Sequence, residues 1–341
     1  MKRLLAVLVM GALLAPPAFA RELVDLSGRP VLVPDTVHKV YGAFSSTVAA
    51  LSAIAPDRLA GVYYTHTPVQ DRFLPPVMTS LPLLTVSGPQ TWDPERVLAL
   101  GVDLAVVMTD TGLSNMVRDR LASLGIAAVA IRGTRVRDYP ESFRFLGRVF
   151  GREERGETLA RFIEDGLERL DKTVGTLPEA ERRRVYYTES PDGLQSQCAN
   201  ADRAEVLILA GARNVLVCEG VQTMASQPQV TPETLLALDP DVIVARFPEA
   251  ARRFRTDPRW ADLRAVRDNQ VFVAPQLPFN WVDRPPSYMR LMGAFWLAHT
   301  LYPDRFPLDL PAHTRLFLET FFQISPSDEA IAALLDPEAA P

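Results

Sequence analysis

Short apolar runs alternate with amphipathic segments along most of the chain. The runs at 37–42, 59–63, 104–108 and 127–131, and later at 185–188, 215–217, 242–245 and 271–273, predict buried strands. Helical spacing of apolar residues predicts helices over 47–54, 113–124, 203–210, 288–301 and 315–324. Alternating strands and helices are typical of parallel sheets covered on both faces. We therefore expect an α/β protein with two doubly wound lobes.

One long amphipathic segment separates the two groups of strands. Apolar residues recur at helical spacing within 152–175, at Leu159, Phe162, Ile163, Leu167 and Leu170. The segment is rich in Glu, Arg and Leu rather than in the Gly, Ser and Pro of a flexible linker. We expect a rigid connecting helix over 152–175, an N-terminal lobe over 21–151 and a C-terminal lobe over 176–341.

The two halves contain a repeated unit. Residues 93–103 align with residues 231–241, and both copies start with Asp or Thr followed by Pro and Glu. A capping oxygen, a proline at the first helical position and an acid in the first turn are favourable at a helix start. Each copy then runs into an apolar strand, so both are predicted to fold as a short helix, a turn and a buried strand.

The first 20 residues have the pattern of a signal peptide. Lys2 and Arg3 precede an apolar run at 4–14, and residues 18–20 form a small-residue cleavage site. A transmembrane anchor is the alternative, but the run is shorter than the roughly 18 to 20 residues that span a bilayer. No cysteine follows the run, so a lipid-anchored start is not supported. We expect export to the periplasm, with a mature chain that begins at Arg21 and does not insert in the membrane.

Charge and size narrow the possible partners. The chain has 341 residues, 36 Lys and Arg, and 41 Asp and Glu, for a net charge of -5. Removal of Lys2 and Arg3 leaves 34 positive groups and a net charge of -7. Such a surface does not attract nucleic acid or an anionic bilayer. The length suits about two domains with sizeable cores.

Cys198 and Cys218 are the only two cysteines in the sequence. In an oxidising compartment such a pair tends to form a disulfide, which would contribute roughly 3 kcal/mol for a loop of this size. Metal ligation by the two thiolates is the alternative, although no Cys-x-x-Cys spacing or neighbouring histidine supports it. We expect the disulfide.

Sequence motifs of common enzymes are missing from this chain. It contains no G-x-S-x-G, G-x-x-x-x-G-K-[ST], G-x-G-x-x-G or H-E-x-x-H motif. With four histidines and a bridged cysteine pair, little remains for a nucleophile or a closed zinc site. We therefore predict no catalytic residues, no resident metal and no cofactor. A metal-dependent or chelatase-like enzyme of related fold remains the alternative.

Three features follow the signal peptide in order, namely the opening segment at 24–31, the paired Pro-Glu helices and the segment at 210–215. With them, essentially the whole mature chain resembles the helical-backbone (class III) solute-binding proteins of ABC transporters. This resemblance implies a monomer that binds ferric siderophores, haem, cobalamin or a related chelate between two lobes and delivers it to a permease. A molybdate and tungstate branch belongs to the same class. The resemblance also implies that one acid on each lobe docks on the permease, and Glu95 and Glu233 occupy matching positions.

Ligands of open α/β sheets bind beyond the carboxyl ends of the strands, and several loops are predicted there. Their side chains could contact a chelate or an oxyanion through hydroxyl, imidazole, carboxylate, guanidinium, amide or aromatic groups. Our candidates are Ser46, Tyr64, His66, Asp110, Arg246, Asn280 and Trp281. The last two lie in a proline-rich loop at 275–287, whose prolines reduce the entropy cost of ordering it.

The candidate cleft residues favour some classes of ligand over others. His66 with Asp110 is too small a set for a bare divalent ion. Molybdate or tungstate needs converging donors, such as Ser46 and Arg246, without much aromatic surface. The aromatic residues Tyr64 and Trp281 favour an iron-siderophore or a similar metal chelate. We therefore expect a chelate, with the oxyanion as the alternative.

Overall fold

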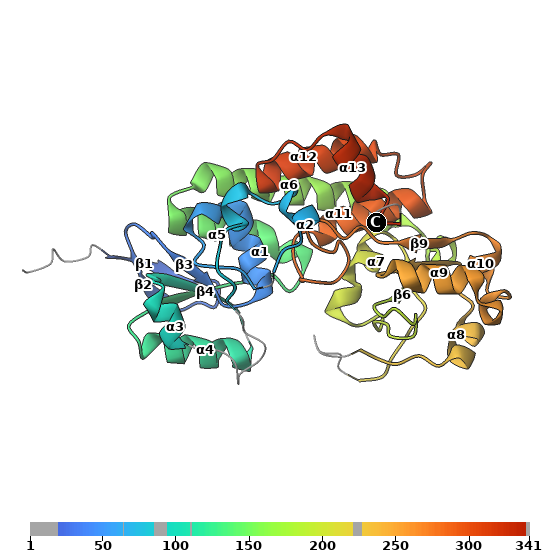
Figure 1. Cartoon of the computed structure of the whole chain (residues 1–341), viewed down its shortest axis with the longest axis horizontal. Coiled ribbons are helices and arrows are strands. Elements are labelled where there is room, and N and C mark those ends of the chain that lie inside the picture. The colour runs from blue at the N-terminus through green and yellow to red at the C-terminus, as the bar shows by residue number, and fades with distance from the viewer. Residues whose placement is uncertain (1–19, 64, 85–93, 110, 221–226, 339–341) are drawn as a thin grey trace, which may run out of the picture.

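The computed structural model describes residues 20–63, 65–84, 94–109, 111–220 and 227–338. It confirms an α/β fold with a parallel sheet in each of two lobes (Figure 1). The first sheet has the order β3-β4-β5, from β3 (Val40–Gly42), β4 (Leu104–Met108) and β5 (Ala127–Ile131). The second has the order β7-β6-β8-β9, from β6 (Arg184–Thr188), β7 (Arg213–Asn214), β8 (Val242–Ala245) and β9 (Val271–Val273).

Helices cover these sheets. In the first lobe they are α1 (Ser45–Ile54), α2 (Pro68–Asp71), α3 (Pro94–Ala99), α4 (Gly112–Ala122) and α5 (Tyr139–Phe150). The second half of the chain contributes α7 (Glu205–Leu209), α8 (Pro232–Leu238), α9 (Pro248–Thr256), α10 (Arg264–Arg267) and α11 (Arg290–Leu301). It ends with α12 (Leu310–Phe322), which packs against α1 and α6, and α13 (Asp328–Leu335), which packs against α12. Short 3₁₀ helices cover Pro56–Arg58, Pro76–Met78, Val136–Asp138, Val174–Thr176, Glu179–Glu181, Asp202–Ala204 and Pro258–Trp260. The described part of the chain contains no helix that is both long and apolar enough to cross a bilayer.

An antiparallel hairpin, β1 (Ala20–Val24) and β2 (Pro30–Pro34), flanks the first sheet. Its turn contains Asp25, which is buried and accepts a hydrogen bond from the backbone N–H of Ala130 at 3.0 Å. The same carboxylate pairs with Arg118 of α4 at 3.0 Å. The hairpin is thus fixed to β5 and α4 by a carboxylate whose charge is balanced.

Helix α6 (Glu153–Lys172) lies on the same side of the molecule as α12 and packs against both α5 and α11, in the segment where the sequence predicts a connecting helix (Figure 1). Leu159, Ile163 and Leu167 on its apolar face are buried. A Cβ atom at Gly156 would lie 2.5 Å from the Phe143 carbonyl oxygen, so glycine lets α6 approach α5 closely.

The apolar core runs without interruption from one lobe into the other. Phe143 of α5 and Phe321 of α12 meet Tyr288 at ring-centroid distances of 5.6 and 4.7 Å. Phe162 of α6 lies 5.4 Å from Phe321. Because aromatic rings bury large areas and prefer defined geometries, this layer joins helices from both halves of the chain.

A buried ion pair also bridges the lobes. Arg290 of α11 is 1% exposed and pairs with Glu205 of α7 at 3.0 Å. Its Nη2 donates to the Thr134 carbonyl of the first lobe at 2.7 Å. Glu205 in turn accepts a hydrogen bond from the Val136 backbone N–H at 3.0 Å. Breaking such a pair leaves a buried charge uncompensated, so this network resists separation of the lobes.

The repeated segments fold as the same unit, because α3 precedes β4 as α8 precedes β8. The expected strand at 59–63 is wrong, since within the described part of the chain this segment makes only single bridges, from Leu59 to Val40 and from Val62 to Leu83. A Cβ at Gly61 would lie 2.5 Å from the Pro82 carbonyl, and this close crossing replaces a longer ladder. The strand expected at 215–217 instead ends at Asn214.

The expected disulfide is confirmed. Cys198 and Cys218 are bonded, with 5.6 Å between their Cα atoms. A backbone hydrogen bond from Ala199 N–H to the Leu216 carbonyl, at 2.8 Å, lies beside it. The bridge ties the segment that follows β6 to the segment that follows β7.

His313 makes folding stability depend on pH. Burial, with a smaller contribution from Arg169, lowers the pKa of His313 from 6.5 to about 4. The fold therefore favours neutral imidazole, and stability present above pH 6.5 is lost as pH falls toward 4. Between pH 7 and pH 5 we expect this residue to account for a loss of about 2 kcal/mol in urea unfolding.

His313→Phe should lack this loss, because phenylalanine keeps a ring against Phe295, 4.6 Å away, without a titrating group. The exposed His38→Gln is the matched control and should retain the loss. Equal losses in His313→Phe and the parent chain would assign the titration to another group.

Candidate ligand-binding cleft

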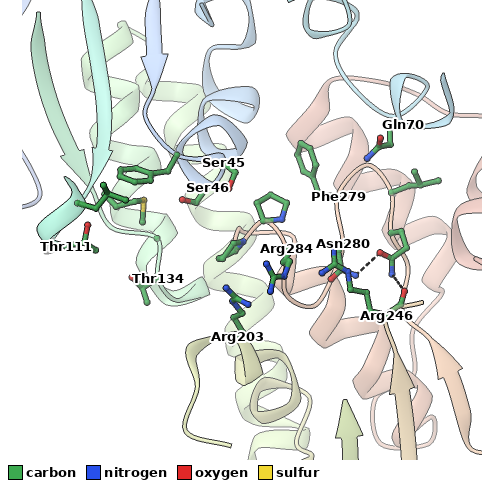
Figure 2. Close-up of a pocket in the computed structure, with 18 of the residues that line it drawn as sticks. Ser45, Ser46, Gln70, Thr111, Thr134, Arg203, Arg246, Phe279, Asn280 and Arg284 are labelled. Carbon is green, nitrogen blue, oxygen red and sulfur yellow. Dashed lines mark hydrogen bonds between the residues drawn. The ribbon is translucent and has the colours of Figure 1, made fainter. Parts of the chain in front are cut away.

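A cleft of about 830 Å³ lies between the lobes (Figure 2). Its first-lobe wall comes from segments that follow β3, β4 and β5, and its second-lobe wall from segments that follow β6, β8 and β9. This is the carboxyl end of both parallel sheets, where the sequence places the binding loops. Apolar side chains line much of it, from Phe44, Met108, Leu113, Leu277, Phe279, Pro285 and Pro286.

The first-lobe wall presents hydroxyl groups and helix N-termini. Ser45 and Ser46 form the first turn of α1, and both line the cleft. Thr111 caps α4, and its hydroxyl accepts from the Ser114 backbone N–H at 3.0 Å. Both helices direct the positive end of their dipole to this wall, which favours a negatively charged ligand.

The second-lobe wall carries three arginines, Arg203, Arg246 and Arg284, across the cleft from Ser45 and Ser46 (Figure 2). Their side chains are 9%, 22% and 36% exposed. The Nε atoms of Arg203 and Arg246 are buried and have no hydrogen-bond partner among the residues that the structure describes. Unsatisfied buried donors are costly, so an acceptor from a ligand would be stabilising here.

Two buried carboxylates lie behind the arginines. Glu189 follows β6, is 1% exposed at its side chain, and lies 3.1 Å from Arg284 Nη2 and 3.6 Å from Arg203 Nη1. The fully buried Asp283 lies 3.6 Å from Arg246 Nη1 and 3.8 Å from Arg284 Nε. Three cations thus face two carboxylates, which leaves a positive charge to be balanced from the cleft.

Burial raises the pKa of the Glu189 carboxyl, and the negative charge of Asp283 raises it further. The hydrogen bond and charge of Arg284 act in the opposite direction. Burial, then Asp283 and Glu189, also raise the pKa of Tyr187 far above its usual range, so this phenol stays neutral beside the two carboxyls.

The loop at 275–287 is held by its own amide groups. The Asn280 side-chain oxygen accepts from the N–H groups of Val282 and Asp283 at 2.7 and 2.8 Å. Its amide nitrogen donates to Gln276 at 2.9 Å, and Gln276 donates to the Arg246 carbonyl at 2.9 Å (Figure 2). Asn280 lines the cleft, where the sequence analysis expects it, but its polar atoms form hydrogen bonds within the loop.

The placement of Trp281 in the cleft is wrong. Its side chain is 0% exposed, it does not line the cleft, and its Nε1 donates to the Leu277 carbonyl at 2.9 Å. The loop turns at this point so that Trp281 enters the core, against which α11 packs closely through Gly293. A large apolar ring gains more free energy there than at a partly wet wall.

His66 is also outside the cleft wall. Its side chain is 5% exposed, and its Nδ1 lies 3.7 Å from Asp71. Burial lowers its pKa, while Asp71 raises it. Tyr64 and Asp110 lie outside the described residues. Among the residues described, no group of three or more His, Cys, Asp or Glu side chains is placed to hold a metal ion.

The structure thus brings together Ser46, Arg246 and Asn280 of the predicted set, and adds Arg203 and Arg284. The position of Arg284 in the proline-rich loop was a weak indication that it lines the cleft. Arg203 gave no such indication, because arginine is abundant in the chain and this residue begins a predicted helix. Gln70 of α2 was also missed, and its amide reaches the Pro278 carbonyl of the opposite lobe at 3.3 Å.

Glu95 and Glu233 occupy the first turns of α3 and α8, and both are exposed. Figure 1 shows these two helices on separate lobes, on the side of the molecule away from α6 and α12.

Comparisons with known proteins place this cleft in context. A family model described as a periplasmic binding protein matches residues 41–277. A solved ABC transporter solute-binding protein of Sulfurospirillum deleyianum is 31% identical, with a TM-score of 0.85 over 93% of this chain and 99% of that chain.

The molybdate-binding protein MolA of Haemophilus influenzae is 27% identical over 188 residues, which cover 54% of this chain and 52% of MolA. The chain thus spans about half the length of this curated relative. A solved MolA structure with bound molybdate is 22% identical, with a TM-score of 0.71 over 90% of this chain and 99% of that chain.

The burial of Trp281 predicts a structural role. Trp281→Ala should lower the free energy of urea unfolding by about 3 to 5 kcal/mol, because it leaves a cavity in the core. Trp281→Phe keeps most of the volume, so it should lose less stability and should bind ligand as the parent chain does. A small loss in Trp281→Ala, or weakened binding by a folded Trp281→Phe, would contradict this placement.

Proposed function

The chain belongs to the periplasmic binding protein family, and on that premise we propose that it carries an anionic metal chelate, such as an iron-siderophore, to an ABC permease. The observation that carries this proposal is the group of three arginines on one wall of the cleft, Arg203, Arg246 and Arg284. Guanidinium groups bind carboxylate, catecholate and other oxyanion groups through paired, charge-assisted hydrogen bonds.

The size and lining of the cleft support a chelate rather than a small ion. About 830 Å³ is typical of sites for organic ligands of drug size, which bury most of their surface against apolar walls. Phe44, Met108 and Phe279 supply such surface opposite or beside the arginines. A chelate with an organic backbone and anionic donor groups uses both features.

A bare oxyanion, molybdate or tungstate, is the second candidate. The similarity to MolA supports it, as do the hydroxyls of Ser46 and Thr111 and the N-termini of α1 and α4. An oxyanion would engage the arginines and hydroxyls and leave the apolar lining without a partner.

We propose further that the chain is exported. We propose that residues 1–20 are a cleaved signal peptide and that the mature chain, from Arg21, acts in the periplasm as a monomer. Tyr64, His66 and Asp110 remain proposed ligand contacts, with His66 reaching a ligand only after local movement, because its side chain is buried. A chelatase-like enzyme is the weaker reading, since the family and its relatives are named as binding proteins.

Isothermal titration of the mature protein with ferric catecholate and hydroxamate chelates, haem, cobalamin, molybdate and tungstate tests the ligand class. We expect one-to-one binding of an anionic ferric chelate. Single substitutions Arg203→Gln, Arg246→Gln and Arg284→Gln should each weaken it about 10- to 100-fold, the effect of a charge-assisted hydrogen bond.

The exposed Arg132→Gln in the first lobe is the matched control and should bind normally, because Arg132 pairs with Glu141 outside the cleft. Binding of molybdate or tungstate alone would replace the chelate with the oxyanion. Catalytic turnover of a chelate would favour the enzyme.

A second prediction concerns permease docking. Reversal of both charges, Glu95→Lys with Glu233→Lys, should abolish uptake in cells while ligand affinity in titrations stays at the parent value, because neither helix lines the cleft. The exposed Glu141→Lys is the control for a general charge effect. Reduced ligand affinity in the double variant, or normal uptake, would overturn the docking assignment.

A further inference from the structure

Glu189 and Asp283 lie behind the three arginines of the cleft wall, and each arginine contacts at least one of these two carboxylates. Glu189 contacts Arg203 and Arg284, and Asp283 contacts Arg246 and Arg284. Neither carboxylate lines the cleft. A ligand therefore meets guanidinium groups whose charge is already partly balanced from behind.

The two acids also act on each other. Glu189 and Asp283 are both buried, and the charge of Asp283 disfavours ionisation of Glu189. Glu189 accepts hydrogen bonds from the amides of Gln197 and Gln227, the latter at 3.2 Å. Neither carboxylate oxygen of Asp283 has a hydrogen-bond donor among the described residues, although two arginines lie within 4 Å. Burial and the nearby charge of Asp283 therefore favour the protonated form of Glu189.

Among the residues that the structure describes, few ionisable groups surround the pair. They are Arg203 from Asp202–Ala204, Arg246 after β8, Arg284 from the loop at 275–287, and Tyr187 of β6. Tyr187 stays neutral, so the net charge of the cluster is one positive with both acids ionised and two positive with one proton bound.

From this geometry we infer that Glu189 and Asp283 are positioning residues that match the charge of the arginine cluster to the ligand, and that Glu189 takes up a proton when a dianionic or more highly charged group enters the cleft. The inference rests on the proposed function in one respect, that the ligand is an anion. A monoanionic group is balanced by the ionised pair, and a dianionic group is balanced once one acid is protonated. Uncompensated buried charge is costly, so the proton accompanies the second negative charge.

Ligand affinity is expected to depend on pH. A bound anion raises the pKa of Glu189, so the complex holds more protons than the free protein. Affinity should rise as pH falls through the interval between the two pKa values, by at most about tenfold per pH unit for one proton. Outside that interval the pair contributes no pH dependence.

Calorimetric titration in buffers of different ionisation enthalpy, HEPES and Tris at equal pH, measures the proton directly. The probes are molybdate, which stays a dianion in this range, and a ferric tris-catecholate. We expect the binding heats in the two buffers to differ by an amount that corresponds to uptake of up to one proton per bound anion.

Substitutions at Glu189 and Asp283 test whether the proton taken up on binding resides in this pair. Glu189→Gln and Asp283→Asn should each reduce the uptake and flatten the pH dependence of affinity, an effect that a purely structural role would not produce. The exposed Glu141→Gln should retain the full uptake. The titration of the parent chain decides the matter even if a variant does not fold.

The outcomes separate this inference from the proposed function. Binding with equal heats in both buffers overturns the inference alone. Uptake that persists unchanged in both variants assigns the proton to another group and also overturns it. No binding of either probe overturns the anion-carrier proposal, and this inference with it.

Discussion

Arg290 and Glu205 form a buried ion pair at the junction of the lobes, and the shape of the cleft depends on it. The arginine donates to the Thr134 carbonyl of the first lobe, which lines the cleft, and to the Asp202 carbonyl, next to Arg203. Its partner Glu205 accepts from Val136. Because removal of one member would leave a buried charge unpaired, the pair fixes the distance between a first-lobe loop and the base of the arginine wall.

The aromatic layer around Tyr288 extends this constraint over a wider area. It joins α5, α6 and α12, and Gly156 brings α5 and α6 into close contact. Closely packed interiors resist continuous deformation, so two lobes that share one core have less freedom than two lobes joined by a flexible linker. In such a molecule, selectivity depends on how well a ligand complements a cleft that is already formed, and less on closure around it.

Three arginines on one wall repel one another, and two buried carboxylates of the second lobe offset this repulsion. Glu189 and Asp283 approach the guanidinium groups from the core side, which leaves the cleft side for a ligand. The first lobe contributes no comparable charge among its described lining residues; its serine and threonine hydroxyls and the ends of α1 and α4 provide weaker, neutral donors. On the proposed function, this asymmetry favours an anionic group bound by the second-lobe arginines, with the rest of the ligand against the apolar side chains that both walls contribute.

The α/β class and the repeated helix-strand unit were predictable from the sequence, because hydrophobic periodicity and capping residues are local properties. With two cysteines in an exported chain, the pairing of Cys198 with Cys218 was the expected one. Ser46 and Arg246 could be placed at the cleft from the sequence, since Arg246 directly follows β8 and Ser46 lies in the first turn of the helix that follows β3. Side-chain direction in the loop at 275–287 depended on packing, which places Trp281 in the core and Arg284, three residues later, at the cleft wall. An irregular loop has no period from which to infer the direction of a side chain. The contacts among Glu189, Arg203, Arg246 and Asp283 likewise join segments far apart in sequence, so they exist only once the second sheet and its loops are packed together.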